Sequence, residues 1–287
     1  MSRKTIGIIV ILIWVAGLGA LYRRSVNTTL AQRLTEVGMR ISPERYYYTL
    51  EQNGSPIGVA MSAIDTSKTR VTAFDLVRGR FPVGDDTLRI EARSEARFTR
   101  GMRLRDFIIR ADGDITPFMI RGVMQEGEEK MLRTISSSKS KRDKPITQDA
   151  IADAPVFVPT MAPLTLMLTK SPKIGDSVRV SMYDPMSRNL KTTTMRIQAD
   201  SLFLVADSAT FDSTSNRWVK AHQDSLRGWR ITGRTSPIMV WVDAGGRVIA
   251  ASEPGGISML RTAFEIAFAN WKIEETQRAP DVYRKGR

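Results

Sequence analysis

The chain has a single histidine, His222, which lies two residues before Asp224 in the segment VKAHQDS. Residues i and i+2 of a strand share a face, so the imidazole and the carboxylate could touch. An imidazole beside a carboxylate is the pair that serves as general base in many hydrolases. Such an enzyme would also need a nucleophile turn of the type G-x-S-x-G, which this sequence lacks. We therefore interpret His222 as a solvent-facing strand residue and expect no catalytic residues.

Two glycine pairs, Gly245-Gly246 and Gly255-Gly256, stand ahead of an apolar segment that predicts a helix. Glycines before a helix N-terminus bind phosphate in many proteins. A P-loop, however, requires a lysine directly after its last glycine, and here Ile257 and Ser258 follow. We expect the first pair to form a turn between two strands and the second to lead into the helix.

Metal and cofactor sites are not indicated by the residue types. Cysteine is absent, and one histidine is too few for the multi-histidine sites that bind zinc. The carboxylates show neither the spacing of an EF-hand loop nor the H-E-x-x-H motif. We expect no metal site, no cofactor and no enzymatic activity.

The formal net charge of +13 raises the question of a nucleic-acid partner. However, arginines alternate with acids along the predicted strands, as in Arg93, Glu95 and Arg97. This alternation is typical of a solvated sheet face and not of a groove that follows phosphates. We therefore expect no nucleic-acid partner.

One dense basic cluster lies in a segment without periodicity. Its members are Lys139, Lys141, Arg142 and Lys144. Such a cluster can contact a partner protein or anionic lipid headgroups, and a solvated loop is the alternative.

An uncharged, mostly apolar run from Thr5 to Tyr22 lies between two basic flanks. As a helix it would be ~27 Å long, close to the ~30 Å hydrocarbon core of a bilayer. Trp14 lies within the run, and Tyr22 ends it where an aromatic ring with a polar tip suits the headgroup level. A cleaved signal peptide and a buried core helix are the alternatives, but the run is long and has no polar face. We predict a single-pass anchor over residues 1–24 in the inner membrane, with the body on the periplasmic side.

Residues 25–43 predict a juxtamembrane helix or linker. Leu30, Leu34 and Val37 recur at helical spacing, and Gly38 can end the helix. We interpret the helix as a spacer near the headgroups. The alternative is a stripe that packs on a neighbouring transmembrane helix.

From residue 44 the apolar pattern changes to a period of two, which is typical of strands. Asn53-Gly54 between two such runs is a strong hairpin signal. Residues 136–150 predict a loop, and a short helix follows near residues 160–169. The sequence thus predicts a mainly β fold: one transmembrane helix, then curved antiparallel sheets of half-barrel or barrel-like shape over residues 44–272. A division of this β-rich domain into two halves would lie near residues 136–155.

The last predicted element is a C-terminal helix, packed on the sheets, from about Ile257 to Trp271. Its apolar face would be formed by Leu260, Phe264, Phe268 and Trp271. The helix would either plug the sheet or form the lid of a cavity. Residues 273–287 predict a polar tail without a core.

The aromatic strand Tyr46-Tyr47-Tyr48-Thr49-Leu50, the Asn53-Gly54 turn and the Ile57-Gly58 pair resemble the first hairpin of extracytoplasmic β domains of the DUF3108 type. The segments LRIEARSEARF, PVFVP and WVDAGGRVIAAS are similar to the same group, so the resemblance covers roughly residues 46–252. It implies a curved or barrel-like sheet in the cell envelope and carries over no catalytic residue.

The combination of anchor, β-rich body and tail also resembles a membrane-extrinsic subunit of the gemmatimonad double-ring photosystem. That resemblance implies reaction-centre and light-harvesting polypeptides as partners. We therefore expect a non-enzymatic accessory subunit of a membrane complex that contacts other subunits and membrane lipids. The alternative is an envelope carrier or chaperone for lipid or another hydrophobic ligand. A cavity under the C-terminal helix would favour the carrier, and a filled interior would favour the subunit.

Overall fold

The structure is a computed structural model that describes residues 30–84, 86–125, 131–138, 144–168, 172–185, 187–233, 239–253 and 255–278. None of the helices within these ranges is long and apolar enough to cross a bilayer. The predicted anchor, with Thr5, Trp14 and Tyr22, lies outside the described residues. So do Lys139, Lys141, Arg142 and residues 279–287 of the predicted tail.

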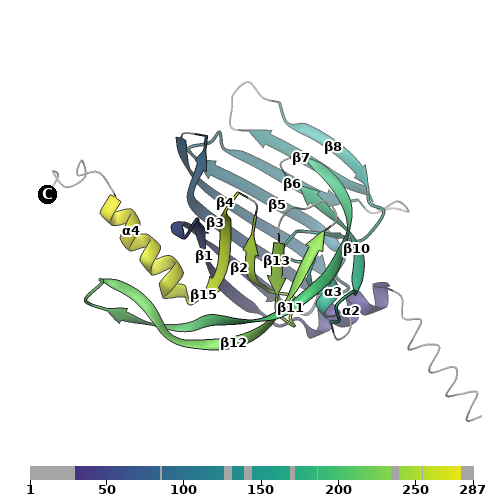
Figure 1. Cartoon of the computed structure of the whole chain (residues 1–287). Coiled ribbons are helices and arrows are strands. Elements are labelled where there is room, and N and C mark those ends of the chain that lie inside the picture. The colour runs from purple at the N-terminus through teal and green to yellow at the C-terminus, as the bar shows by residue number, and fades with distance from the viewer. Residues whose placement is uncertain are drawn as a thin grey trace, which may run out of the picture.

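The described chain is mainly β-structure, as predicted, and its fifteen strands form one curved sheet (Figure 1). The strands of the first half are β1 (Glu44–Gln52), β2 (Ser55–Thr66), β3 (Arg70–Val83), β4 (Asp86–Thr99), β5 (Leu104–Gly113), β6 (Phe118–Met124), β7 (Met131–Ser138) and β8 (Ile146–Ile151). The others are β9 (Val156–Phe157), β10 (Ser177–Asp184), β11 (Asn189–Asp212), β12 (Arg217–Gly233), β13 (Met239–Val242), β14 (Val248–Ser252) and β15 (Ile257–Thr262).

The sheet order is β8-β7-β6-β5-β4-β3-β2-β1-β15-β14-β13-β12-β11-β10-β9. Two meanders therefore join at β1 and β15, where Tyr47 lies opposite Thr262 and Gln52 opposite Ile257. Neighbouring strands are antiparallel, except that β9 runs parallel to β10. Residues 152–155 connect β8 with β9, which are the two ends of this order.

The predicted loop over residues 136–150 is partly wrong, because Ile146–Ile151 is the edge strand β8. Ile146 lies opposite Ser136, and Ile151 lies opposite Met131. The segment is polar and exposed along most of its length, so its own composition gives no apolar alternation from which a strand could be inferred. Its pairing with β7 decides its conformation.

Helix α2 (Leu30–Arg40) lies within the segment 25–43 for which a helix or linker is predicted, and its apolar side packs on the sheet of the same chain. Leu34, Val37 and Ile41 belong to the main core, together with Phe98 of β4 and Met102 of the β4–β5 turn. Gly38 lies inside the helix and does not end it, and the Arg100 guanidinium donates to its carbonyl at 2.7 Å. The helix therefore packs on the β4–β5 turn, and the stripe 34/37/41 covers the sheet.

The main core lies on the face of the sheet that α2 covers. The segment after β9 enters it as well, with helix α3 (Leu164–Met167) close to the predicted position. Large side chains fill this core, and Phe98 stacks on Phe157 at 5.8 Å between ring centroids. The interior of the curved sheet is thus occupied by side chains.

Two of the predicted turns are confirmed. Asn53 and Gly54 both have positive φ, 49° and 79°, as a two-residue hairpin between β1 and β2 requires. Gly246, with φ of 74°, closes the turn between β13 and β14, where the Asp243 carboxylate accepts from two backbone N–H groups. Gly255-Gly256 joins β14 to β15, so these glycines lead into a strand and not into a helix.

The predicted helix Ile257–Trp271 is wrong in its first half. Residues 257–262 are β15, and Leu260 lies opposite Thr49 on one side and Ala250 on the other. This segment lies between β1 and β14 and forms backbone hydrogen bonds with both strands. These hydrogen bonds stabilise the strand conformation, although the apolar residues are spaced as in a helix. The helix itself consists of the π-helix η1 (Glu265–Ala269) and α4 (Asn270–Arg278). It extends into the region predicted as a polar tail from residue 273.

Candidate functional site

The most unusual part of the described chain is a ribbon formed by β11 and β12. These are the two longest strands of the described chain, with 24 and 17 residues. β10 pairs with β11 only up to Arg196, and β13 pairs with β12 only from Trp229 onward. Between these points and the turn at residues 213–216, the two strands pair only with each other within the described chain. We call residues 199–228 the ribbon (Figure 1).

The base of the ribbon packs on the sheet. The Phe203 ring lies edge-on to Trp241, with centroids 5.0 Å apart, and Gly228 leaves room for that ring. Val205 and Ala206 are buried as well. These contacts matter because an isolated two-stranded ribbon is only marginally stable in water.

The tip of the ribbon is held by the C-terminal helix. Asn270 bonds both backbone groups of Trp218, and Arg217 forms an ion pair of 3.1 Å with the buried carboxylate of Glu274. The Phe211 ring lies edge-on to Trp218. The ribbon is therefore an arm fixed at both ends.

The ribbon exposes apolar side chains between its fixed ends. Leu202 is 71% exposed and Leu204 is 64% exposed. Strand alternation places both on one face, opposite to the face of Phe203 and Val205. Arg227 and Ser225 lie across the ladder from the two leucines. This face of the ribbon thus carries two adjacent exposed leucines beside polar residues.

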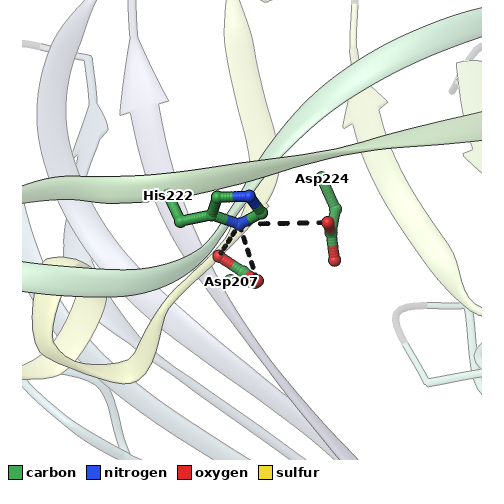
Figure 2. A group of neighbouring side chains, drawn as sticks. All are labelled: Asp207, His222 and Asp224. Atoms are coloured by element: carbon green, nitrogen blue, oxygen red, sulfur yellow. Dashed lines mark hydrogen bonds and ion pairs between the residues drawn. The ribbon is translucent and has the colours of Figure 1, made fainter.

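The ribbon also brings His222 together with two carboxylates (Figure 2). Its Nδ1 lies 3.0 Å from each oxygen of Asp207 on the neighbouring strand and 3.9 Å from Asp224 Oδ1. The predicted contact with Asp224 is therefore the looser of the two. All three side chains are exposed, in keeping with the interpretation of His222 as a solvent-facing strand residue. The hydrogen bond from His222 holds the pKa of Asp207 below its usual value.

This cluster offers one imidazole and two carboxylate oxygens within 4.8 Å of one another, a set of donors that a divalent cation could use. The imidazole is already engaged through Nδ1, and water reaches all three groups. A catalytic dyad would need a nucleophile hydrogen-bonded to the imidazole. The neighbouring hydroxyl of Ser208 donates to Asp207 at 3.3 Å instead of to the His222 ring. The geometry is that of a solvated hydrogen bond at the surface.

The residues predicted for the C-terminal plug or lid are separated by the structure. Trp271 is buried against Val59, and the Phe268 ring stacks on Phe264 at 5.6 Å between centroids. Leu260 belongs to β15 and not to the helix. By strand alternation this cluster lies on the face of the sheet opposite to the main core, so the helix does not plug the concave interior.

Of the predicted basic cluster, only Lys144 is described. It is exposed, it precedes β8, and it lines a cavity between β7 and the β10–β11 turn.

Sequence reasoning missed the partners that make the ribbon one unit. Asp207 faces His222 only once the register of β11 and β12 is known, including two bulges near Ser208. Asn270 lies in a segment that reads as an ordinary amphipathic helix. The polar run Ser213–Asn216 was a usable signal, because it marks a hairpin turn between two alternating segments.

The chain matches no protein-family model and no curated protein. Two solved structures are similar to it in fold. One is a β-barrel-like protein of the DUF1849 domain from Brucella abortus, at 13% identity and a TM-score of 0.47, over 78% of this chain and 96% of that one. The other is a DUF1089 family protein from Pseudomonas aeruginosa, at 10% identity and a TM-score of 0.34, over 69% of this chain and 90% of that one. Identities this low assign the chain to neither family.

Proposed function

We propose that the protein is a non-enzymatic accessory subunit of a multi-subunit membrane complex, and that the ribbon is the surface that holds a neighbouring subunit. The observation that carries this proposal is the exposure of Leu202 and Leu204 on an arm fixed at both ends. Scattered exposed apolar residues are ordinary on protein surfaces, whereas contiguous apolar patches mark contact sites, and Leu202 and Leu204 are neighbours on one face of a projecting element.

The fixed arm is suited to association. Burying one leucine side chain contributes ~1.5–3 kcal/mol. A surface already held in its bound conformation loses little conformational entropy when a partner binds. The ion pair of Arg227 with Asp200 beside Leu202 supplies a polar margin of the kind found at the rim of interfaces.

The described chemistry supports a subunit without catalysis. The imidazole of His222 is solvated and contacts only carboxylates among the described residues. Val59, Ala267 and Trp271 fill the space beneath the C-terminal helix. That packing favours the accessory subunit over a carrier whose cavity is closed by this helix.

The proposal includes the remaining expectations from the sequence. The apolar run of residues 5–22 would anchor the chain in the inner membrane, with the body on the periplasmic side. Its partners would be other subunits of the complex and membrane lipids, and the resemblance to a photosystem subunit suggests reaction-centre and light-harvesting polypeptides. The net charge of +13 would favour acidic partner surfaces, where complementary charge sets the orientation of docking.

Purification of the native protein in a mild detergent tests the proposal. We expect membrane polypeptides to co-purify in fixed stoichiometry with the wild type, and to be lost when Leu202→Glu and Leu204→Glu are combined. A matched control combines Ile151→Glu and Ile174→Glu, two residues that are equally exposed outside the ribbon at 62% each. Migration of the wild-type protein alone as a monomer, or equal loss of partners in both double variants, would overturn the proposal.

A further inference from the structure

The curved sheet does not close on itself among the described strands. Its order ends at β8 on one side and at β9 on the other. The connection through residues 152–155 is short, and ~3.3–3.6 Å per residue is the longest reach of a chain. The end of β8 and the start of β9 therefore lie near each other, and no ladder joins these two described strands. We call the gap between β7–β8 and the β10–β11 turn the seam.

Two cavities open along the seam. The first has a volume of about 220 Å³ and lies between the β7–β8 pair and the start of β11. The second has a volume of about 440 Å³ and lies toward the end of β7. Arg188, from the β10–β11 turn, lines both. Small-molecule sites typically enclose ~300–1,000 Å³, so the second cavity alone is large enough for a small ligand.

The larger cavity combines an apolar floor with a basic margin. Phe118 and Ile120 are aligned with Ser138 and Ser136 across the ladder, on the face that carries the main core. Ile146 extends the floor from β8. The margin carries two exposed cations, Lys144 and Arg188, and Arg188 forms no ion pair with a described carboxylate.

The smaller cavity contains a buried polar group without a partner. Tyr183 is only 4% exposed and lines this cavity, and its hydroxyl forms no hydrogen bond with a described residue. The Thr134 hydroxyl donates to the Gln148 carbonyl at 3.3 Å and acts on the Tyr183 phenol as a polar neighbour, but it does not reach the phenol in hydrogen-bond geometry. Burial raises the pKa of Tyr183, which keeps the phenol a neutral donor, while Thr134 and Arg188 act in the opposite direction. Buried polar groups are nearly always paired, so the Tyr183 phenol is a donor that water or a bound ligand in this cavity can use.

We propose that the seam binds a small amphiphilic anion with one apolar chain. The anionic group would bind Arg188 and accept a hydrogen bond from Tyr183, and the chain would lie on Phe118, Ile120 and Ile146. A carboxylate and a phosphate monoester share the required chemistry: charged oxygens that accept from a guanidinium and a phenol. The mixed lining and the limited volume favour one short chain over a two-chain lipid. This site is independent of the ribbon, because Arg188 lies at the opposite end of β11 from the tip.

Titration calorimetry of the full chain in a non-ionic detergent tests the proposal, with the heat of detergent alone subtracted. The probes are octanoate, octyl phosphate, 1-octanol and octyltrimethylammonium. We expect saturable binding of at least one of the two anions and none of the alcohol or the cation. The stronger anion identifies the head group, and binding by either supports the site. Equal heats for all four probes would mean apolar partitioning only and would overturn the proposal, as would the absence of saturable binding.

Two variants assign the contacts. Arg188→Gln should weaken anion binding by at least ~10-fold, because hydrogen bonds to charged groups are among the strongest in proteins. Tyr183→Phe should also weaken binding but should leave the melting temperature of the free protein equal or higher, since it removes an unpaired buried hydroxyl. Arg196→Gln is the matched control, an exposed arginine of β11 outside both cavities. Unchanged affinity in Arg188→Gln, or an equal loss in Arg196→Gln, would overturn the assignment. The ribbon double variant at residues 202 and 204 should bind the anion normally, so the two proposals fail separately.

Discussion

The side-chain amide of Asn270 binds both backbone groups of Trp218, 52 residues earlier in the chain. Its Oδ1 accepts from the Trp218 N–H at 2.8 Å, and its Nδ2 donates to the Trp218 carbonyl at 2.9 Å. The amide thus replaces a third strand at the edge of β12 and joins the tip of the ribbon to the C-terminal helix.

Replacement of Asn270 should free the ribbon tip. Asn270→Asp keeps the oxygen that accepts from the Trp218 N–H. It replaces the amide nitrogen, which donates to the Trp218 carbonyl, with a second oxygen. The hydrogen bond to that carbonyl is therefore lost. We expect a local cost of ~1–3 kcal/mol, the range for leaving a buried polar partner unpaired. Hydrogen exchange followed by mass spectrometry should show faster exchange over residues 209–220. Thr276→Ala, on the exposed side of α4, is the control and should leave this exchange unchanged. If the tip exchanges as slowly in Asn270→Asp as in the wild type, the ion pair of Arg217 with Glu274 is sufficient to hold it, and the prediction is contradicted.

Trp271 should be the main anchor of the C-terminal helix. It is 5% exposed, packs with Val59 and Ala267, and receives the Arg80 guanidinium over its ring at 5.8 Å. Trp271→Ala should lower the free energy of unfolding by ~3–5 kcal/mol, as large-to-small changes of buried aromatic residues do. Urea unfolding measures this cost, and Lys272→Ala, at an exposed neighbouring position, should cost less than ~0.5 kcal/mol. Similar midpoints for the two variants would contradict the assigned packing.

Local signals in the sequence predicted those features that depend on neighbouring residues alone. The Asn53-Gly54 hairpin follows from the preference of these two residues for positive φ, and the alternation of β1 to β7 follows from one face being buried. The spacing of Leu260 to Phe264 and Trp271 fits 3.6 residues per turn and therefore predicts a helix. The strand conformation of Leu260 depends on β1, which lies more than 200 residues earlier. The contact of His222 with Asp207 likewise depends on register and bulges, which composition does not encode.

The carboxylate of Asp75 should cost stability at neutral pH. It accepts hydrogen bonds from the hydroxyls of Ser62, Ser94 and Thr160, at 2.8, 3.0 and 2.9 Å. Burial raises its pKa above the ordinary value of 3.8, in spite of these bonds. A raised pKa in the folded state means that folding binds a proton. Stability from this group is therefore complete below pH ~4 and is lost as the pH rises through the folded pKa.

Asp75→Asn keeps an acceptor for the hydroxyls and removes the charge. We expect the variant to gain stability relative to the wild type between pH 4 and pH 7, with the difference smallest at the acid end. Urea midpoints of both proteins at the two pH values measure this difference. The comparison must be made between the proteins, because carboxylates with lowered pKa, such as Glu44 beside Arg247, destabilise both as the pH falls. A difference that does not change with pH would show that Asp75 titrates normally.

The glycine at position 38 should be required by close packing and not by helix termination. A Cβ at Gly38 would lie 1.9 Å from the Arg100 carbonyl oxygen, a backbone atom that cannot move without disturbing the β4–β5 turn. Gly38→Ala should therefore destabilise the protein by ~1–3 kcal/mol or more, although alanine is favoured over glycine by ~1 kcal/mol within a helix. Gly101→Ala is the matched control on the facing turn, because its Cβ would meet only the Thr35 and Thr99 hydroxyls, at 3.4 and 3.6 Å. Thermal unfolding of the two variants separates the interpretations: if Gly38 only ended the helix, Gly38→Ala would be no more destabilised than Gly101→Ala.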